Sequence, residues 1–509
     1  MEKVSFIQTI KQAYLRVRNS KAVQTINTYL SSPWGICFFG ALTLVSYCFG
    51  LEFYLWSFVV LSVIYMSLFS DDLLPVMPLF VLCYVSPSAE NNPFKMGGSI
   101  FLSGATGIFL IVLICVAFAC LIARIVLDKN MGLKKLFTQK RALLIGFLVL
   151  GGSFFLSGIG SAKYLSEIGK NLVFAFLQFV AFFLLYFLFS ATVDWKKVKK
   201  EYFFWIGLVV GMVVVGELIH NYCTRDIIDE NGSIVRGQLL TGWGIHNNIG
   251  AMIALGIPCA LALAVDSKHG YAYITASIVL LVGTFFSGSR AATLAAVASF
   301  IIGAITLCVK IMDKRHLIAF AVIFGLFAVV GLGIFGEQVL GLFDRVPDII
   351  QPGEEGGLVI NDSDRMGVYK EGIKYFLQYP VFGDGFYASG EYAPWQPGKV
   401  EEFKQFLPGR WHNTIIQMMA ACGAVGLVAY LFHRFQTVKL FFKKRSVTTW
   451  FIALTIVSLL GMSLLDCHLF NIGPAFFYSI ALTFMEFLPQ EEKDKKTEQP
   501  QSSEQEETK

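Results

Sequence analysis

The chain has 509 residues, of which 55% are hydrophobic and 15% are charged, and its mean hydropathy is +0.62. An average soluble domain carries about 25% charged residues, so this composition excludes an ordinary soluble protein. The formal net charge of +5 is modest and does not indicate nucleic-acid binding. Many apolar stretches reach the roughly 20 residues that a helix needs to cross a hydrocarbon core about 30 Å thick, which predicts a polytopic membrane protein.

Residues 1–33 are polar and basic, and they lack the layout of a secretory signal peptide. This composition predicts a cytoplasmic amphipathic segment, after which the first apolar span acts as an uncleaved anchor. Its cationic residues are Lys3, Lys11, Arg16, Arg18 and Lys21.

The apolar segments that follow predict an all-α polytopic integral membrane protein with about 12–14 transmembrane helices. Residues 34–335 would hold the first eleven spans, 336–411 a large external loop, 412–488 three more spans, and 489–509 a disordered cytoplasmic tail. One of the short early spans could instead be re-entrant. The fourteen expected spans lie near residues 34–50, 52–69, 73–87, 103–125, 141–158, 170–191, 202–220, 247–265, 271–287, 291–309, 317–335, 412–432, 449–466 and 471–488.

The charges in the loops orient this layout. The loops that it places inside, such as DWKKVKK and HRFQTVKLFFKKRS, are rich in Lys and Arg, whereas those that it places outside carry fewer positive charges. Because short cytoplasmic loops carry an excess of positive charge, both termini are expected in the cytoplasm.

Polar side chains gather at the predicted outer ends of the spans. Each of them alone fits a structural role or a loop charge, but together they indicate that functional chemistry collects at the outer face. They are Glu217, His220, Arg225, Arg236, His246, Asn247 and Asn248, followed later by Asp466 and His468.

Arg290 is the one charged residue in the apolar run 271–309. As a single helix, these roughly 39 residues would extend about 58 Å, nearly two bilayer thicknesses. Two spans are therefore expected, joined by the turn 287–289, with Arg290 at the external mouth and at the start of the helix 291–309. An arginine beside free backbone N–H groups is suited to hold an anion, and a snorkelling membrane anchor is the alternative.

The external loop is expected to be structured, because structureless loops of this length are uncommon. The stretch DSDRMGVYKEGIKYFLQYP predicts an amphipathic helix at the outer surface that begins near Arg365 and stops before Pro380. In VFGDGF, which follows, the glycines favour a turn over a phosphate-binding loop. Trp395 and Trp411 fit interfacial anchors or, alternatively, platforms for sugar stacking.

His412 and Asn413 stand where this loop enters the next span. A histidine at the external surface can act as a general base or orient a substrate by hydrogen bonding at neutral pH. A solvated histidine at the end of a loop is the alternative. Asp384, Glu391 and Asp466 are candidates for an assisting carboxylate.

The ten cysteines form no CxxC pair and no Cys/His spacing typical of a metal site, so small apolar side chains within spans are the expected reading.

Three motifs, in this order, resemble those of the O-antigen ligase and O-antigen polymerase (Wzy-type) superfamily of bacterial membrane glycosyltransferases. They are SGSRAA at 287–292, the helix led by Arg365 that runs to YPVFGDGF at 379–386, and WHNTIIQMMAACGAVGL at 411–427. The resemblance covers residues 280–430 closely and the remainder only as hydropathy. The chain departs from the family in its larger number of predicted spans and in the insert QPGEEGGLVIND at 351–362.

The resemblance implies transfer of a glycan from undecaprenyl pyrophosphate to an acceptor hydroxyl at the outer face of the cytoplasmic membrane. The product would be a surface polysaccharide (O-antigen, capsule or exopolysaccharide), and the acceptor a second glycan or a lipid. Arg290 and Arg365 would engage the donor pyrophosphate, and His412 would serve the transfer. Ser289, Asn413, Trp411, His246 and Asn248 are expected to contact the substrate.

The resemblance implies no metal and no cofactor, which fits the lack of an external Asp-rich cluster in the sequence. The implied partners are the lipid-linked donor, the acceptor and the lipid bilayer. The sequence leaves open the choice between ligase and polymerase, the sugar and its linkage, and the oligomeric state.

A transporter, such as a flippase for lipid-linked oligosaccharides, is the main alternative function. Transporters usually place binding residues near the midplane, on broken helices of repeated halves, whereas here the charges stand at one face around a single asymmetric loop. A membrane scaffold without chemistry is the second alternative.

Overall fold

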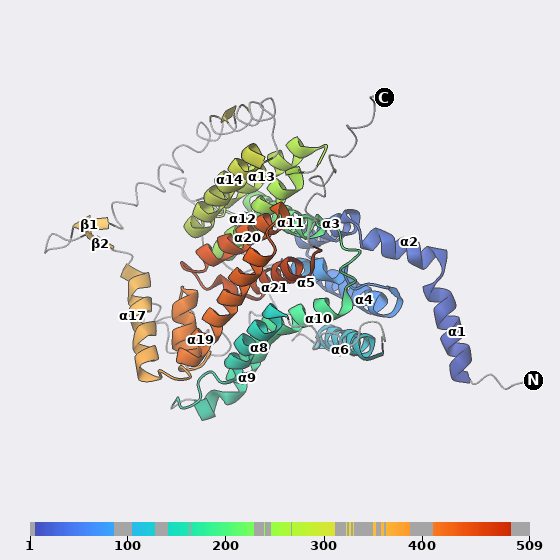
Figure 1. Ribbon diagram of the computed structural model, residues 1–509, viewed down its shortest axis with the longest axis horizontal. Coiled ribbons are helices and arrows are strands. Elements are labelled where there is room, and N and C mark those ends of the chain that lie inside the picture. The colour runs from blue at the N-terminus through green and yellow to red at the C-terminus, as the bar shows by residue number, and fades with distance from the viewer. Residues whose placement is uncertain are drawn as a thin grey trace, which may run out of the picture.

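The protein is a bundle of α-helices, which confirms the predicted all-α polytopic class (Figure 1). The expected span 317–335, the loop tryptophan Trp395 and the tail lie outside the described residues, apart from isolated positions. The computed structural model describes residues 6–85, 104–127, 141–161, 164–228, 246–265, 267–310, 363–386 and 411–489, with the strand residues 350–352 and 358–360 and a few isolated positions.

Seven helices of the described residues are long and apolar enough to cross a membrane, and they follow the expected spans. These are α4 (Glu52–Phe69), α6 (Gly104–Leu127), α9 continued by η2 and α10 (Tyr164–Phe179, Val180–Leu184 and Leu185–Thr192), α11 (Tyr202–Thr224), α12 (His246–Val265), α14 (Arg290–Lys310) and α19 (Thr414–Lys443).

Further apolar helices complete the bundle. α2 (Lys21–Leu30) and α3 (Pro33–Phe49) together form an eighth candidate span that is bent by 73°. The shorter helices are α5 (Val76–Val85), α8 (Ala142–Phe155), α13 (Gly270–Phe286), α20 (Val447–Met462) and α21 (Ile472–Phe487).

Helix α12 is the centre of the bundle and packs against α11, α13, α14 and α20. Small residues let its backbone approach that of α11, because a Cβ atom on Gly256 would lie 3.0 Å from the carbonyl oxygen of Gly207 and 3.5 Å from Cα of Gly211. Close approach through small residues is the usual way in which membrane helices gain packing energy. The first turn of α12 is thereby held at a fixed height in the bundle.

The N-terminal segment is helical and lies at one side of the bundle, with α1 (Phe6–Arg18) farthest out (Figure 1). Two contacts tie it to the turn after α4. Arg18 forms an ion pair of 2.8 Å with Asp71, and the side-chain N–H of Asn27 donates to the carbonyl oxygen of Phe69 over 3.1 Å. A basic amphipathic helix that precedes a sharp bend is typical of a segment lying along a membrane surface.

Helix α19 is interrupted at Gly423, whose φ of 64° and ψ of −160° lie far from helical values. The segment 380–386 inserts into this break and replaces the missing helical hydrogen bonds, as an apolar environment without water requires. The N–H groups of Asp384, Gly385, Ala424 and Val425 donate to the carbonyl oxygens of Ala420, Ala421, Pro380 and Val381 over 2.8, 3.0, 2.8 and 3.1 Å.

The glycines of VFGDGF therefore serve backbone packing. Gly383 has a φ of 71°, and a Cβ atom there would lie 2.4 Å from the carbonyl carbon of Ala421. Both glycines of this segment have positive φ, as expected for a turn. Asp384 is buried and accepts a hydrogen bond from the Ser161 hydroxyl, which joins this insertion to the loop after α8.

The predicted amphipathic helix of the external loop is α17 (Ser363–Gln378), which ends before Pro380 and lies alongside α19 (Figure 1). A small hydrophobic cluster separate from the main core joins the two helices. A Cβ atom on Gly372 of α17 would lie 2.5 Å from a methyl group of Ile416, so the helices are in close contact. The cluster consists of Val368, Trp411 and Ala420, with Tyr375 and Ile416 packed against them.

Two strands of three residues, β1 (Ile350–Pro352) and β2 (Leu358–Ile360), pair antiparallel before α17. They flank the insert at 351–362, whose other residues lie outside the described part of the chain.

Candidate functional site

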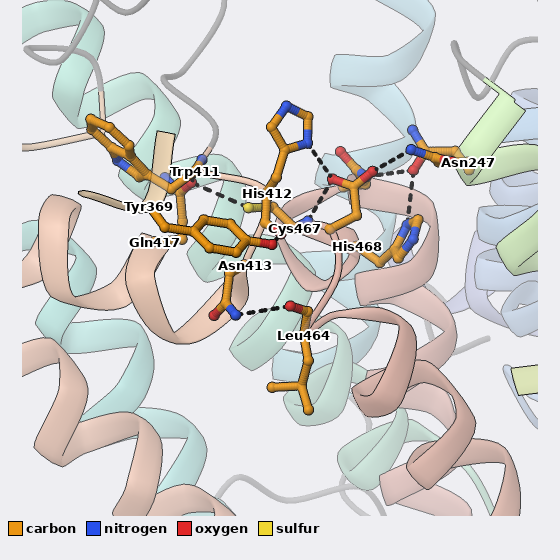
Figure 2. A network of polar contacts seen from close by, with 12 residues as sticks. Asn247, Tyr369, Trp411, His412, Asn413, Gln417, Leu464, Cys467 and His468 are labelled. Carbon is orange, nitrogen blue, oxygen red and sulfur yellow. Dashed lines mark hydrogen bonds and ion pairs between the residues drawn. The ribbon is translucent and has the colours of Figure 1, made fainter. Parts of the chain in front are cut away.

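His412 has an unusual backbone conformation. Its φ is 47°, and among the described residues it is the one non-glycine residue with positive φ. Such conformations are sparsely populated, and they persist where surrounding contacts enforce them, often at functional sites. Three neighbours hold this one. The N–H of Trp411 donates to Oε1 of Gln417 over 3.0 Å, the Tyr369 hydroxyl donates to the His412 carbonyl oxygen over 3.1 Å, and Asn413 caps α19 (Figure 2).

The His412 ring lies against a buried carboxylate. Its Nδ1 is 3.3 Å from Oδ1 of Asp466, which follows α20 and is 3% exposed. Asn247, in the first turn of α12, donates to the other carboxylate oxygen over 2.9 Å, and the N–H of Cys467 donates to Oδ1 over 2.7 Å (Figure 2). With Nδ1–H directed at the carboxylate, Nε2 is the ring nitrogen available to a substrate.

Asp466 is a stable anion in this setting. Burial alone would raise the pKa of its carboxyl group. The hydrogen bond from His412, the electrostatic influence of the imidazoles of His468 and His412, and the N–H of Cys467 outweigh burial, so the pKa lies well below its ordinary value. A fixed negative charge therefore stands beside the partly exposed imidazole.

A second buried network holds the turn that carries Asp466. Oδ1 of Asn248 lies 3.0 Å from Nδ1 of His468 and accepts from the side-chain N–H of Asn471 over 2.6 Å. Because the Asn248 oxygen is an acceptor, Nδ1 of His468 is the donor. These contacts join α12 to η4 (His468–Phe470) and to the start of α21. Two neighbouring residues of α12, Asn247 and Asn248, therefore both hold the turn that carries Asp466.

Arg290 begins α14, directly after the turn 287–289, as predicted from the length of the apolar run. The turn rests on Gly250 of α12, where a Cβ atom would lie 2.6 Å from Oγ of Ser287 and 2.8 Å from Cβ of Ser289. Gly250 is three residues, or about one helical turn, after Asn247. Arg290 and the His412–Asp466 pair are thus anchored to the same end of α12.

The Arg290 side chain is half-buried, and no described residue pairs with it by a hydrogen bond or an ion pair. A guanidinium group offers five N–H donors and no acceptor. This arrangement suits an arginine that awaits an anionic ligand.

Arg365 lies in the first turn of α17, four residues before Tyr369. Residues four apart share a face of a helix, so Arg365 lies on the face of α17 whose tyrosine bonds the backbone of His412. Its side chain and that of His246, which begins α12, lie outside the described residues.

The remaining expected contact residues hold structural positions. The Trp411 ring is buried beneath α17, 5.4 Å from the ring of Tyr375. Asn413 caps α19 and donates to the Leu464 carbonyl oxygen over 2.8 Å. Ser289 and Asn248 are buried in the networks just described. Contact of these residues with a substrate stays a prediction.

Sequence reasoning did not single out Gln417, and it left Asp466 as one of several carboxylates. Gln417 accepts from the N–H of Trp411 and from the Cys467 thiol over 3.4 Å, so it links the segments that carry His412 and Asp466. The one available signal was the position of Asp466 and His468 at a predicted external turn. Glu391 lies outside the described residues, and Asp384 lies in the break of α19. Within the described part of the chain, no group of three or more His, Cys, Asp or Glu residues is placed to hold a metal ion.

Residues 275–431 match the family model described as O-antigen ligase. The matched segment includes Arg290, Arg365 and His412, whereas Asn247 and Asp466 lie outside it. The match confirms the resemblance to the O-antigen ligase superfamily that the three motifs indicate. A comparison with curated proteins found no match to the chain.

Proposed function

From the match of residues 275–431 to the O-antigen ligase family, we propose that the chain is a membrane glycosyltransferase of surface polysaccharide biosynthesis. It transfers a glycan from undecaprenyl pyrophosphate to an acceptor hydroxyl at the outer face of the cytoplasmic membrane. The observation that carries this proposal is the His412–Asp466 pair, held on the same end of α12 as Arg290, whose guanidinium pairs with no residue of the described part of the chain.

His412 is the general base of the proposed reaction. Nε2 removes the proton of the acceptor hydroxyl while the hydroxyl oxygen attacks the anomeric carbon of the donor sugar. The new glycosidic bond forms as the bond between that carbon and the pyrophosphate oxygen breaks, and the pyrophosphate leaves with the electron pair. The proton stays on His412, where the Asp466 carboxylate stabilises the imidazolium through Nδ1–H.

The arginines stabilise the leaving group. Guanidinium groups bind phosphate oxygens in bidentate geometry, and such contacts strengthen as negative charge develops in a partly dehydrated site. Arg290 supports this role because its donors are unused by the described residues, and Arg365 because its helix contacts the His412 backbone.

The broken helix α19 is the feature that favours a transporter, since transporters often bind substrates at broken helices. Here the segment 380–386 fills the break and accepts or donates the hydrogen bonds that the break releases. The helix ends are therefore already occupied, and the polar network around His412 lies beside the start of α19 instead.

The test is transfer by the full-length protein in nanodiscs, supplied with an undecaprenyl-pyrophosphate-linked oligosaccharide from its own host. Arg290→Ala, Arg365→Ala and His412→Ala are each expected to reduce transfer by about a hundredfold or more. Arg445→Ala, after the far end of α19, is the matched control and keeps full activity. Longer chains in the product identify a polymerase, and a newly glycosylated lipid acceptor identifies a ligase. Movement of unchanged glycan across the bilayer by the wild type would contradict the proposal.

A further inference from the structure

Gly250 lies where the turn carrying Arg290 rests on α12. An added Cβ atom there would meet three side chains of the turn and of the start of α14 at distances that real Cβ atoms do not adopt. These are Oγ of Ser287 at 2.6 Å, Cβ of Ala292 at 2.8 Å and Cβ of Ser289 at 2.8 Å.

Two of these contacts cannot be relieved by rotating a side chain. A Cβ atom is fixed to the backbone, so Ser289 and Ala292 can move away only if their backbone moves. Tightly packed interiors transmit such a displacement and do not absorb it. A methyl group at position 250 must therefore shift the turn 287–292 away from α12.

The turn would move as one body. The hydroxyl of Ser287 donates to the carbonyl oxygen of Thr284 over 2.7 Å, and the hydroxyl of Thr293 donates to that of Ser289 over 2.9 Å. The N–H of Ala292 lies 3.4 Å from Oγ of Ser289, which caps the helix start. Arg290 lies between these bonded positions, so a shift of the turn carries its backbone with it.

The His412–Asp466 pair would not move in the same way. Asn247 holds Asp466 from the first turn of α12, and Asn248 holds the same loop through His468 and Asn471. Asn247 and Gly250 are on one rigid helix, about 4.5 Å apart along its axis. The absence of a side chain at Gly250 therefore sets how closely the turn that carries Arg290 lies to the end of α12 that holds Asp466.

We propose that Gly250 is a positioning residue for Arg290, and this inference rests on the proposed function of Arg290 as a ligand of the donor pyrophosphate. Gly250 itself touches no reacting atom. Its role is to let the turn 287–292 lie against α12.

The experiment measures binding of inorganic pyrophosphate and glycan transfer by the full-length protein. The variants are Gly250→Ala, Arg290→Ala and the two combined. We expect Gly250→Ala to weaken pyrophosphate binding at least about tenfold and to lower transfer by up to about a hundredfold, as a misplacement of roughly 1 Å does elsewhere. In the Arg290→Ala background the same substitution should change neither quantity more than about twofold, because residues that act through one group are not additive.

Gly303→Ala is the matched control. Gly303 is on α14, and its added Cβ atom would lie 2.6 Å from Cδ1 of Leu261 on α12, so the same helix pair is perturbed far from Arg290, here by contact with a side-chain end that can rotate. This variant should keep pyrophosphate binding. A loss equal to that of Gly250→Ala would show that general packing of α12 against α14 is responsible and would overturn the inference.

Two further outcomes separate the inference from the proposed function. If Arg290→Ala loses pyrophosphate binding while Gly250→Ala keeps it, or if Gly250→Ala remains harmful in the Arg290→Ala background, the positioning role is wrong and the proposed function stands. If the wild type and Arg290→Ala bind pyrophosphate equally, the proposed role of Arg290 is wrong and the inference fails with it.

Discussion

At the scale of single residues, the strained backbone of His412 and the orientation of its ring have connected causes. The positive φ turns the chain so that Nδ1 meets Asp466 while the backbone oxygen meets Tyr369. A residue with a relaxed backbone would direct its side chain elsewhere, so the strain is retained in exchange for orientation. Gln417 reinforces this arrangement by accepting from both flanking segments.

Asp466→Asn is the substitution that tests this orientation. We expect transfer to fall about a hundredfold, because the amide no longer carries the charge that stabilises a protonated His412. Combined with His412→Ala, it should reduce the rate no further than His412→Ala alone. Initial rates of glycan transfer by the three variants measure both effects, with elution volume in detergent as the check on folding.

Asp194→Asn is the matched control, since this carboxylate lies in the turn after α10 and its ion pair with Lys197 is largely exposed. Equal rates for Asp466→Asn and the wild type would exclude an electrostatic role for the pair.

At the scale of elements, the break of α19 is the place where the irregular segment 380–386 bonds to the backbone of a membrane helix. Gly423 adopts a backbone conformation that is essentially restricted to glycine, and an added Cβ atom would lie 2.4 Å from the Val381 carbonyl oxygen. The insertion of 380–386 connects α17 to the interior of the bundle. The position of α17 beside His412 therefore depends on contacts that 380–386 makes with the broken part of α19.

We expect Gly423→Ala to destabilise the protein by about 2 kcal/mol or more, through steric overlap and backbone strain together. Thermal unfolding in detergent measures this as a lower melting temperature. Gly461→Ala in α20 is the control, because no heavy atom lies within 4 Å of the added Cβ and alanine favours a helix by about 0.5–1 kcal/mol. A melting temperature of Gly423→Ala at or above that of Gly461→Ala would contradict the described insertion.

A second contact between elements, made by Asp72, is sensitive to pH. Asp72 lies between α4 and α5, where its carboxylate accepts from the N–H of Leu74 over 2.7 Å and from that of Asp194 over 3.2 Å. Burial raises the pKa of this carboxyl to about 6, although the two N–H donors oppose the shift. Because the folded state binds the proton more tightly than the unfolded chain, the contribution of Asp72 to stability increases as the pH falls through about 6 and is lost as the pH rises above it.

The prediction is that Asp72→Asn removes this pH dependence. The difference in melting temperature between the wild type and the variant should become more favourable to the wild type between pH 7 and pH 4, a window that contains the folded pKa of about 6 and the ordinary carboxyl pKa of about 4. Asp71→Asn is the adjacent control, since the Asp71 side chain is largely exposed in its ion pair with Arg18 and should leave the pH dependence unchanged. A constant difference across this window for Asp72→Asn would disprove the assignment.

At the scale of the whole molecule, the sequence predicted the spans because apolar length and loop charge are local properties. It also placed Arg290 at a turn, since the run around it was too long for one helix. The break at Gly423 could not be predicted, because the residues around it, MMAACGAVGL, are apolar and its interruption depends on a segment about 40 residues earlier in the chain. The same holds for Asp466 and Asn247, whose meeting with His412 requires the packing of α12 against α20.

The ends of the helices also give the bundle two chemically different faces. The C-terminal end of α11 and the N-terminal end of α12 lie at the same face of the bundle, which also carries Asn247, Arg290 and His412. The opposite ends, after α10, α12 and α19, carry a concentration of positive charge. It consists of Lys196, Lys197, Lys199 and Lys200, then Lys268, and then Lys443, Lys444 and Arg445.

This asymmetry predicts that the His412 face is external, since the positive face stays in the cytoplasm. Cys223 near the end of α11 is exposed at the His412 face and offers a native probe. We expect a membrane-impermeant maleimide to label Cys223 in intact spheroplasts and Cys223→Ser to lose this label. A cysteine placed on the positive face by Lys199→Cys in the Cys223→Ser background should react only after the membrane is permeabilised. The reverse labelling pattern would place His412 in the cytoplasm. The pyrophosphate of the proposed donor lies at the outer leaflet, so the site could not reach it. The proposed transfer would then be impossible, whatever the chemistry of the site.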